Sequence, residues 1–126
     1  MVKNVARGFT LIELLVVLAI MGLLLALVSP RYFHSVDTSK EAVLAENLRI
    51  TREAIDHFYA DRKRYPESLN ELVTRRYLRS LPVDPVADSA TAWALIAPPP
   101  ELEGRIADLK SRAPGVGRNG RPYGQW

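Results

Sequence analysis

The chain has 126 residues, a length that suits one modest domain, and it has no cysteine, so disulfides cannot stabilise it. It carries 17 Lys and Arg residues against 14 Asp and Glu residues, a small excess that does not favour a nucleic-acid partner. The two histidines, His34 and His57, lack the spacing of metal ligands, and no Ser-His-Asp arrangement can be argued. We therefore expect surface or interface histidines and a protein that is not an enzyme.

Residues 9–28 form a nearly uninterrupted apolar run in which only Thr10 and Glu13 are polar. About 20 such residues in a helix cross a hydrocarbon core of roughly 30 Å. Lys3 and Arg7 precede the run without an acidic residue, so the positive-inside rule keeps the leader in the cytoplasm and exports the rest. A cleaved secretory signal fits less well, because LALVSPRYF is a poor small-residue cleavage site. The run predicts a single membrane-spanning helix.

Glu13 is unexpected inside this run. A carboxylate at the centre of a membrane anchor costs about 2.5–3.5 kcal/mol on insertion scales, and less near an end. The residues alone leave two interpretations open: the charge is tolerated, or it has a function.

The stretch RGFTLIELLVVLAIMG resembles the class III signal of type IV pilins and type II secretion pseudopilins, in which a short basic leader ends in glycine before an apolar helix. The resemblance implies that a membrane-embedded prepilin peptidase cuts between Gly8 and Phe9 and methylates the new amine of Phe9. It implies a leader of residues 1–8 that is removed, a transmembrane and assembly helix of residues 9–29, and a periplasmic globular domain of residues 30–126.

Cleavage gives a chemical reason for Glu13. The new amine of Phe9 is positive, methylation keeps that charge, and a carboxylate one helical turn away neutralises it at low dielectric. The pair can form within a chain or between chains, and the resemblance favours contact between chains during assembly.

Further along, Gly22 weakens the helix and Pro30 removes a backbone donor. Pro30 either marks the membrane edge or, as the resemblance implies, belongs to a hinge that loosens in the fibre.

Residues 36–60 show the pattern of an amphipathic helix. The apolar residues that recur at helical spacing are Leu44, Leu48, Ile55 and either Phe58 or Tyr59. Charged residues occupy the other faces, where Arg49 can pair with Glu53 and Arg52 with Asp56 as ordinary solvated ion pairs. We expect the apolar stripe to pack on a core.

A short second helix is predicted after this long one. Pro66 ends the long helix, behind a basic cluster at residues 62–64 that caps its negative end. Residues 67–76 then predict the second helix, and LPVDP at residues 81–85 predicts a turn. The inward-facing residues of the second helix are Leu69, Leu72 and Val73. The YP pair before a short helix and the LP-x-DP turn also resemble the pseudopilin pattern.

The last third of the chain has β character. Residues 91–97, TAWALIA, suit a half-buried strand, and residues 104–110, GRIADLK, alternate Ile106 with Asp108 and can pair with it across a Pro98–Pro100 turn. Two or three strands alone bury too little surface, so the sheet must pack on the long helix. The sequence predicts a pilin-like α+β fold with a long N-terminal helix, a short second helix and a small antiparallel sheet.

The tail combines glycines with two aromatic residues, Tyr123 and Trp126, that can fold back as apolar anchors. Its glycines do not form a phosphate loop, because no Lys-Ser/Thr follows them. The resemblance to major pseudopilins implies a calcium loop here that ends in tryptophan. The candidate ligands are Asp108, Ser111 and Asn119. Calcium prefers carboxylates, whereas residues 105–126 contain one acid against five bases, so we expect packing and hydrogen bonds to replace the ion.

The whole chain resembles a major pseudopilin of a type II secretion system. The resemblance implies a structural subunit, anchored in the inner membrane by a single span, that polymerises into a periplasmic fibre supporting protein export. The implied partners are other copies of the chain, minor pseudopilins, the prepilin peptidase and the inner-membrane assembly platform.

Two other functions compete with this one: a type IV pilin and a membrane-anchored enzyme. A type IV pilin, major or minor, would serve adhesion, motility or DNA uptake, but many such pilins carry two cysteines in their C-terminal region and this chain has none. A nucleic-acid partner is not expected, because loss of the leader's two bases reduces the excess of basic residues to one. A membrane-anchored enzyme would need reactive groups that the sequence does not offer, and no cofactor is expected.

Overall fold

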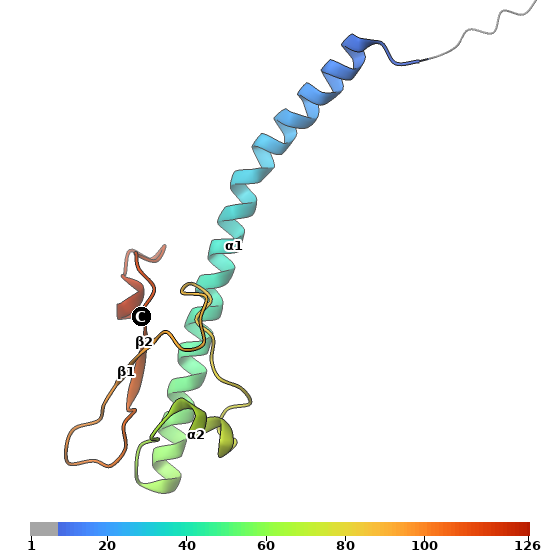
Figure 1. Ribbon diagram of the computed structural model, residues 1–126. Coiled ribbons are helices and arrows are strands. Elements are labelled where there is room, and N and C mark those ends of the chain that lie inside the picture. The colour runs from blue at the N-terminus through green and yellow to red at the C-terminus, as the bar shows by residue number, and fades with distance from the viewer. Residues whose placement is uncertain (1–7) are drawn as a thin grey trace, which may run out of the picture. The chain divides into compact units, whose positions relative to one another are not determined.

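The computed structural model describes residues 8–126, and for residues 29–36 it describes the backbone alone. Its elements in chain order are α1 (Leu11–Arg62), α2 (Leu69–Thr74), β1 (Trp93–Ile96), β2 (Asp108–Ser111) and η1 (Tyr123–Gln125), a one-turn 3-10 helix. The chain divides into two compact units between residues 36 and 37, so α1 contributes to both. The predicted α+β class, with two helices and a two-stranded antiparallel sheet, is confirmed (Figure 1).

The first unit consists of the apolar part of α1. Leu11–Val28 is the one segment in the described part of the chain that is long and apolar enough to cross a membrane, and none of it is buried inside the protein. So large an apolar surface requires lipid or other subunits to cover it. The helix assignment runs through Gly22 and Pro30. A hinge between these two residues stays a prediction, and the basic leader residues Lys3 and Arg7 lie outside the described residues.

The second unit begins with the amphipathic part of α1, whose apolar stripe is confirmed. The buried stripe residues, each at most 2% exposed, are Leu44, Leu48, Ile55 and Phe58. Phe58, not Tyr59, is the fourth member, and Tyr59 instead stacks on Tyr65 with ring centroids 4.6 Å apart. Thr51 completes the stripe because its buried hydroxyl donates to the main-chain oxygen of Asn47 at 2.7 Å.

Helix α1 ends earlier than Pro66. Lys63 adopts a left-handed conformation, with φ of 58°, and its N–H donates to the main-chain oxygen of Tyr59 at 2.8 Å. Such a residue closes an α-helix and sends the chain away from its axis. The left-handed position thus falls on a lysine rather than on glycine, and for this reason the sequence pattern did not reveal it.

Helix α2 is shorter than the predicted range of residues 67–76. Ser68 is its N-cap, because the Ser68 hydroxyl accepts a hydrogen bond from the Glu71 N–H at 3.1 Å. Beyond its end, Arg76 takes a left-handed conformation with φ of 66°. Leu69 and Leu72 are buried and Val73 is partly buried, as predicted.

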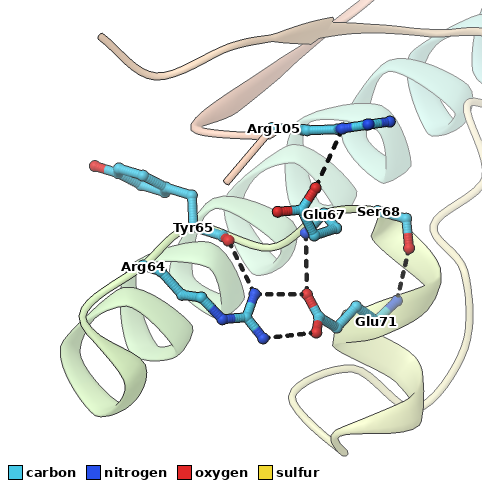
Figure 2. Close-up of polar contacts among 6 residues, drawn as sticks. All are labelled: Arg64, Tyr65, Glu67, Ser68, Glu71 and Arg105. Carbon is cyan, nitrogen blue, oxygen red and sulfur yellow. Dashed lines mark hydrogen bonds and ion pairs between the residues drawn. The ribbon is translucent and has the colours of Figure 1, made fainter. Parts of the chain in front are cut away.

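A charged network holds the start of α2 against neighbouring segments (Figure 2). The guanidinium of Arg64 contacts both carboxylate oxygens of Glu71, at 3.0 and 2.8 Å, and Glu71 also accepts the Glu67 N–H at 3.0 Å. Arg105 pairs with the Glu67 carboxylate at 3.2 Å. The hydrogen bonds from Arg64 lower the pKa of Glu71 to about 2. The network joins the turn after α1, the cap of α2 and the loop before β2.

Strands β1 and β2 pair in antiparallel fashion, with Trp93 opposite Ser111 and Ile96 opposite Asp108. The predicted pairing is confirmed, but both strands are shorter than predicted and a loop of residues 97–107 replaces the tight proline turn. This loop folds back onto the YP segment. Gly104 has φ of 109°, and a Cβ there would lie 2.2 Å from the main-chain oxygen of Tyr65. Close packing against that backbone therefore needs glycine.

One hydrophobic core unites the second unit, in which α2, β1 and β2 lie beside the amphipathic part of α1 (Figure 1). The sheet side of this core is formed by Trp93, Ile106 and Leu109, each at most 3% exposed. The indole N–H of Trp93 donates to the main-chain oxygen of Pro82 at 3.0 Å. The small sheet is stable because it packs on the helix stripe.

Candidate functional site

The Gly8–Phe9 peptide bond lies in an open segment immediately before α1. Residues 8–10 have neither helix nor strand conformation, and Phe9 is 88% exposed. A Cβ built on Gly8 meets no atom within 4 Å. Packing against the described residues therefore does not require glycine at position 8.

Thr10 and Glu13 form a reciprocal cap at the start of α1. The hydroxyl oxygen of Thr10 accepts the Glu13 N–H at 3.2 Å, and the Glu13 carboxylate accepts the Thr10 N–H at 3.3 Å. This is the capping box that Thr-x-x-Glu specifies, and it satisfies two N–H groups that the first turn leaves without partners. The sequence signal for this cap is the Thr-x-x-Glu spacing of residues 10–13. Glu13 thus has a local role at the start of α1 in the full-length chain.

Glu13 stands among apolar neighbours, since it lines a shallow groove with Phe9, Ile12, Val16 and Val17. In the uncleaved chain the nitrogen of Phe9 belongs to a peptide bond, so no amine is present to pair with the carboxylate. An ion pair between Glu13 and a cleaved N-terminus stays a prediction. The geometry supplies what such a pair needs: a carboxylate at the head of an apolar helix, within one turn of the expected amine.

The three candidate calcium ligands are engaged in separate interactions. Asp108 accepts a hydrogen bond from Nε of Arg52 at 2.8 Å, and Asn119 accepts one from the Arg121 N–H at 3.0 Å. Ser111 is buried and donates its hydroxyl hydrogen to the carboxylate of Asp84. The residues present do not fit a calcium ion, which needs several converging oxygen ligands. Among the side chains that the structure describes, those of residues 8–28 and 37–126, no group of three or more His, Cys, Asp or Glu has an arrangement that could hold a metal.

Asp84 is a buried carboxylate that the sequence analysis placed only in a turn. One oxygen accepts the N–H groups of Val86 and Ala87, at 2.9 and 3.0 Å, and the other accepts the Ser111 hydroxyl. Asp84 therefore fastens the turn after α2 to β2, and its buried charge is fully hydrogen-bonded. The LP-x-DP pattern is its sequence signal, because Asp commonly bonds the backbone two residues on.

The two predicted tail anchors, Tyr123 and Trp126, are partly buried and pack against the core. Their rings lie 5.3 Å apart between centroids. The Tyr123 hydroxyl donates to the Glu41 carboxylate at 2.8 Å, and this hydrogen bond raises the pKa of Tyr123. A Cβ on Gly117 would lie 2.4 Å from Cζ2 of Trp126, so the indole rests directly on a glycine.

Of the two ion pairs predicted on α1, Arg49 with Glu53 is present and Arg52 has other partners than Asp56. Arg49 pairs with Glu53 at 2.7 Å, as predicted, and also with Glu46 at 2.6 Å. Arg52 instead reaches Asp108 and two main-chain oxygens in the C-terminal part of the chain, in place of the predicted pairing with Asp56. His57 is exposed, whereas the side chain of His34 lies outside the described residues.

Comparison with known proteins finds a known motif in the N-terminal segment and relatives that match much of the chain. A family model described as the prokaryotic N-terminal methylation motif matches residues 3–29. The type II secretion system core protein G of Pseudomonas aeruginosa is 34% identical over 101 residues, covering 68% of this chain and 71% of that protein. The chain belongs to this pseudopilin family.

Other relatives show how far the likeness to this pseudopilin family extends. The type II secretion system core protein G of Klebsiella michiganensis is 29% identical over 136 aligned positions, covering 95% of this chain and 92% of that protein. The type IV major pilin protein PilA of Myxococcus xanthus is 38% identical over 66 positions, but these cover 52% of this chain and 30% of the pilin. No solved structure gives a significant match. The likeness therefore covers nearly the whole of the Klebsiella michiganensis secretion protein, and less than a third of the pilin.

Proposed function

We propose that this chain is the major structural subunit of a type II secretion pseudopilus, a fibre that supports protein export. One observation carries the proposal: the likeness to a type II secretion core protein G covers 95% of this chain and 92% of that protein, whereas the likeness to the type IV pilin covers 52% of this chain and 30% of the pilin. The globular domain, and not the N-terminal signal alone, therefore follows the secretion proteins.

The first step of the proposed function is processing. A prepilin peptidase cuts between Gly8 and Phe9 and methylates the new amine of Phe9. The methylation-motif match over residues 3–29 supports this step, as does the exposure of the bond. The capping box places the first turn of α1 immediately after the bond, so Gly8 and Phe9 stay outside the helix and accessible to a protease.

The second step is anchoring followed by assembly. Leu11–Val28 holds the subunit in the inner membrane, with the domain on the periplasmic side, and the same surface then packs against other copies in the fibre. In this proposal Gly22 and Pro30 allow the helix to loosen between them. A Cβ at Gly22 meets no atom within 4 Å, so glycine at that position is not demanded by packing within the chain.

Glu13 has two successive partners in this mechanism. Before cleavage it caps α1 through Thr10. After cleavage it neutralises the methylated amine of Phe9 on a neighbouring subunit, because two unpaired opposite charges are costly in an apolar fibre core. The inner-membrane assembly platform and minor pseudopilins are the further proposed partners.

Deletion and complementation in the native organism test the proposal. Deletion of the gene is expected to abolish export of secreted enzymes, and the wild-type gene is expected to restore it. Glu13→Gln keeps the size of the side chain and removes its charge, so we expect little fibre and little export at normal subunit levels. Glu53→Gln, which changes an exposed carboxylate on the same helix, is the matched control and should behave as wild type.

Two results would overturn the proposal. Intact export in the deletion strain together with loss of surface pili would assign the chain to the alternative, a type IV pilin, which the Myxococcus xanthus relative favours. Full complementation by Glu13→Gln would remove the proposed role of the carboxylate in assembly.

A further inference from the structure

Arg52 joins three separate parts of the chain at the C-terminal loop. Its Nε donates to the Asp108 carboxylate at 2.8 Å, and its Nη2 donates to the main-chain oxygens of Leu109 at 3.1 Å and Trp126 at 2.7 Å. Asp108 and Leu109 belong to β2, Trp126 follows η1, and Arg52 itself lies on α1. One positive group therefore meets one carboxylate and two main-chain oxygens drawn from distant segments.

These acceptors are chemically the ligands of a hard cation, since calcium binds carboxylate and main-chain oxygens. A guanidinium satisfies the same oxygens differently, because it stays charged at any physiological pH and its planar fork donates several hydrogen bonds at fixed angles. We propose that Arg52 is the built-in cation of the C-terminal loop, which it orders in place of a bound calcium ion.

The surroundings of Arg52 separate it from an ordinary surface ion pair. The side chains of Arg52 and Asp108 are 35% and 37% exposed, whereas Arg49, in its ion pairs on the same helix, is 54% exposed. Arg52 also lines a hollow with Glu41, Arg121 and Trp126, so its charge acts where the tail meets α1. A charged hydrogen-bond donor that is partly shielded from water contributes more to stability than a fully solvated one.

A calcium ion and the Arg52 guanidinium would exclude one another. Both would need the Asp108 carboxylate, and two positive charges a few ångströms apart repel strongly where water is partly excluded. The other candidate ligands do not offer an alternative site nearby, since Ser111 is bound to Asp84 and Asn119 to Arg121. The tail is therefore independent of calcium because its cation is covalently part of the chain.

Amide hydrogen exchange of the full-length chain in detergent micelles tests this. The reporting amides are those of Gly117, which bonds to Arg121, and Trp126, which bonds to Tyr123. Each protein is measured in EGTA, in calcium chloride and in magnesium chloride of equal ionic strength. We expect the wild-type tail to exchange at the same rate in all three, because no free cation is needed.

Three variants separate the effect of the Arg52 charge from the effect of its planar fork and from that of a solvated arginine. Arg52→Gln keeps hydrogen-bond donors without the charge, and we expect tail amides to exchange about tenfold faster or more. Arg52→Lys keeps the charge without the fork, and should recover part of the protection. Arg49→Gln, the matched control, should stay within about twofold of wild type because its ion pairs are exposed. Amides of α1 near Phe58 report whether a variant remains folded.

Either of two results would overturn the proposal: calcium slows exchange in the wild-type tail, or Arg52→Gln protects the tail as well as Arg52→Lys and wild type do. If Arg52→Gln unfolds throughout, Asp108→Asn replaces it, because that change leaves Arg52 in place and removes only the partner charge. Faster tail exchange in Asp108→Asn without a calcium response would support the built-in cation, and unchanged exchange would refute it.

Discussion

The ion pairs of this protein differ in how much they stabilise the fold, and the pair of Glu71 with Arg64 is the clearest case. Its carboxylate accepts two hydrogen bonds from Arg64 and one from the Glu67 N–H, while most of its side chain is shielded from solvent. By contrast, the Arg49 pairs are half exposed and are expected to contribute little. The folding of the turn between α1 and α2 therefore depends on the ionised form of Glu71.

This dependence predicts a specific acid sensitivity. The pKa of Glu71 is lowered from 4.5 to about 2 in the folded chain, so its stabilising effect is complete above pH 4.5 and is lost as the pH falls toward about 2. Glu71→Gln should lower the melting temperature at neutral pH and flatten its fall between those two values. Glu53→Gln should leave the slope unchanged. Thermal melting followed by circular dichroism across this range is the measurement, and an equal slope in Glu71→Gln would contradict the assignment.

A second prediction at the residue scale concerns the indole of Trp126. Gly117→Ala places a Cβ 2.4 Å from Cζ2 of Trp126, whereas Gly124→Ala places one 3.6 Å from the main-chain oxygen of Ser111. We expect Gly117→Ala to lower the free energy of unfolding by about 1–3 kcal/mol through overpacking, and Gly124→Ala to change it by less than about 0.5 kcal/mol.

Trp126→Ala should lower the free energy of unfolding by less than the ~3–5 kcal/mol expected for a fully buried tryptophan, because Trp126 is only partly buried.

Chemical denaturation of the two glycine variants measures this effect directly. Equal stability of Gly117→Ala and Gly124→Ala would mean that the indole does not rest on Gly117. A destabilised Gly117→Ala combined with a silent Trp126→Ala would contradict the anchoring role of the tryptophan, since the two changes act on the same contact.

At the scale of elements, α1 serves two purposes along its length. Its first part is apolar on every side and is not buried inside the protein, while its second part presents one stripe to the core. Among the residues whose side chains the structure describes, those of the hydrophobic core all lie at position 44 or later. The amphipathic part therefore packs in the second unit, whereas the apolar part is left exposed, as a membrane-spanning helix would be.

Removal of the apolar part tests this division. A chain that begins at Pro30 should be soluble without detergent, folded and largely monomeric, because it keeps the whole core and loses the exposed apolar surface. Size-exclusion chromatography and circular dichroism in detergent-free buffer are the measurements. Aggregation of this shorter chain, or loss of its helical signal, would show that the apolar part is needed to complete the domain.

For the molecule as a whole, local sequence patterns predicted the fold. They did not predict which residues far apart in the sequence form contacts. The stripe from Leu44 to Phe58 follows helical spacing, and Gly8, Phe9 and Glu13 stand in a short motif, so both were legible in the sequence. The partner of Arg52 was not, because Asp108 lies 56 positions away and a nearer acid, Asp56, offered the usual helical spacing. Asp84 likewise has its partner, Ser111, 27 positions away in the sequence. The capping box, by contrast, has a local signal in the Thr-x-x-Glu spacing of Thr10 and Glu13.

Mass spectrometry of the full-length chain, co-expressed with a prepilin peptidase, tests the central claim most directly. The control is Gly8→Val, because a Cβ at this position meets no described atom within 4 Å and the effect of the change is expected to arise at the peptidase. The account predicts a wild-type product that begins at Phe9 and carries one added methyl group, with little or no processing of Gly8→Val. A chain left intact or cut at another bond would contradict the assignment to the processed, fibre-forming subunits.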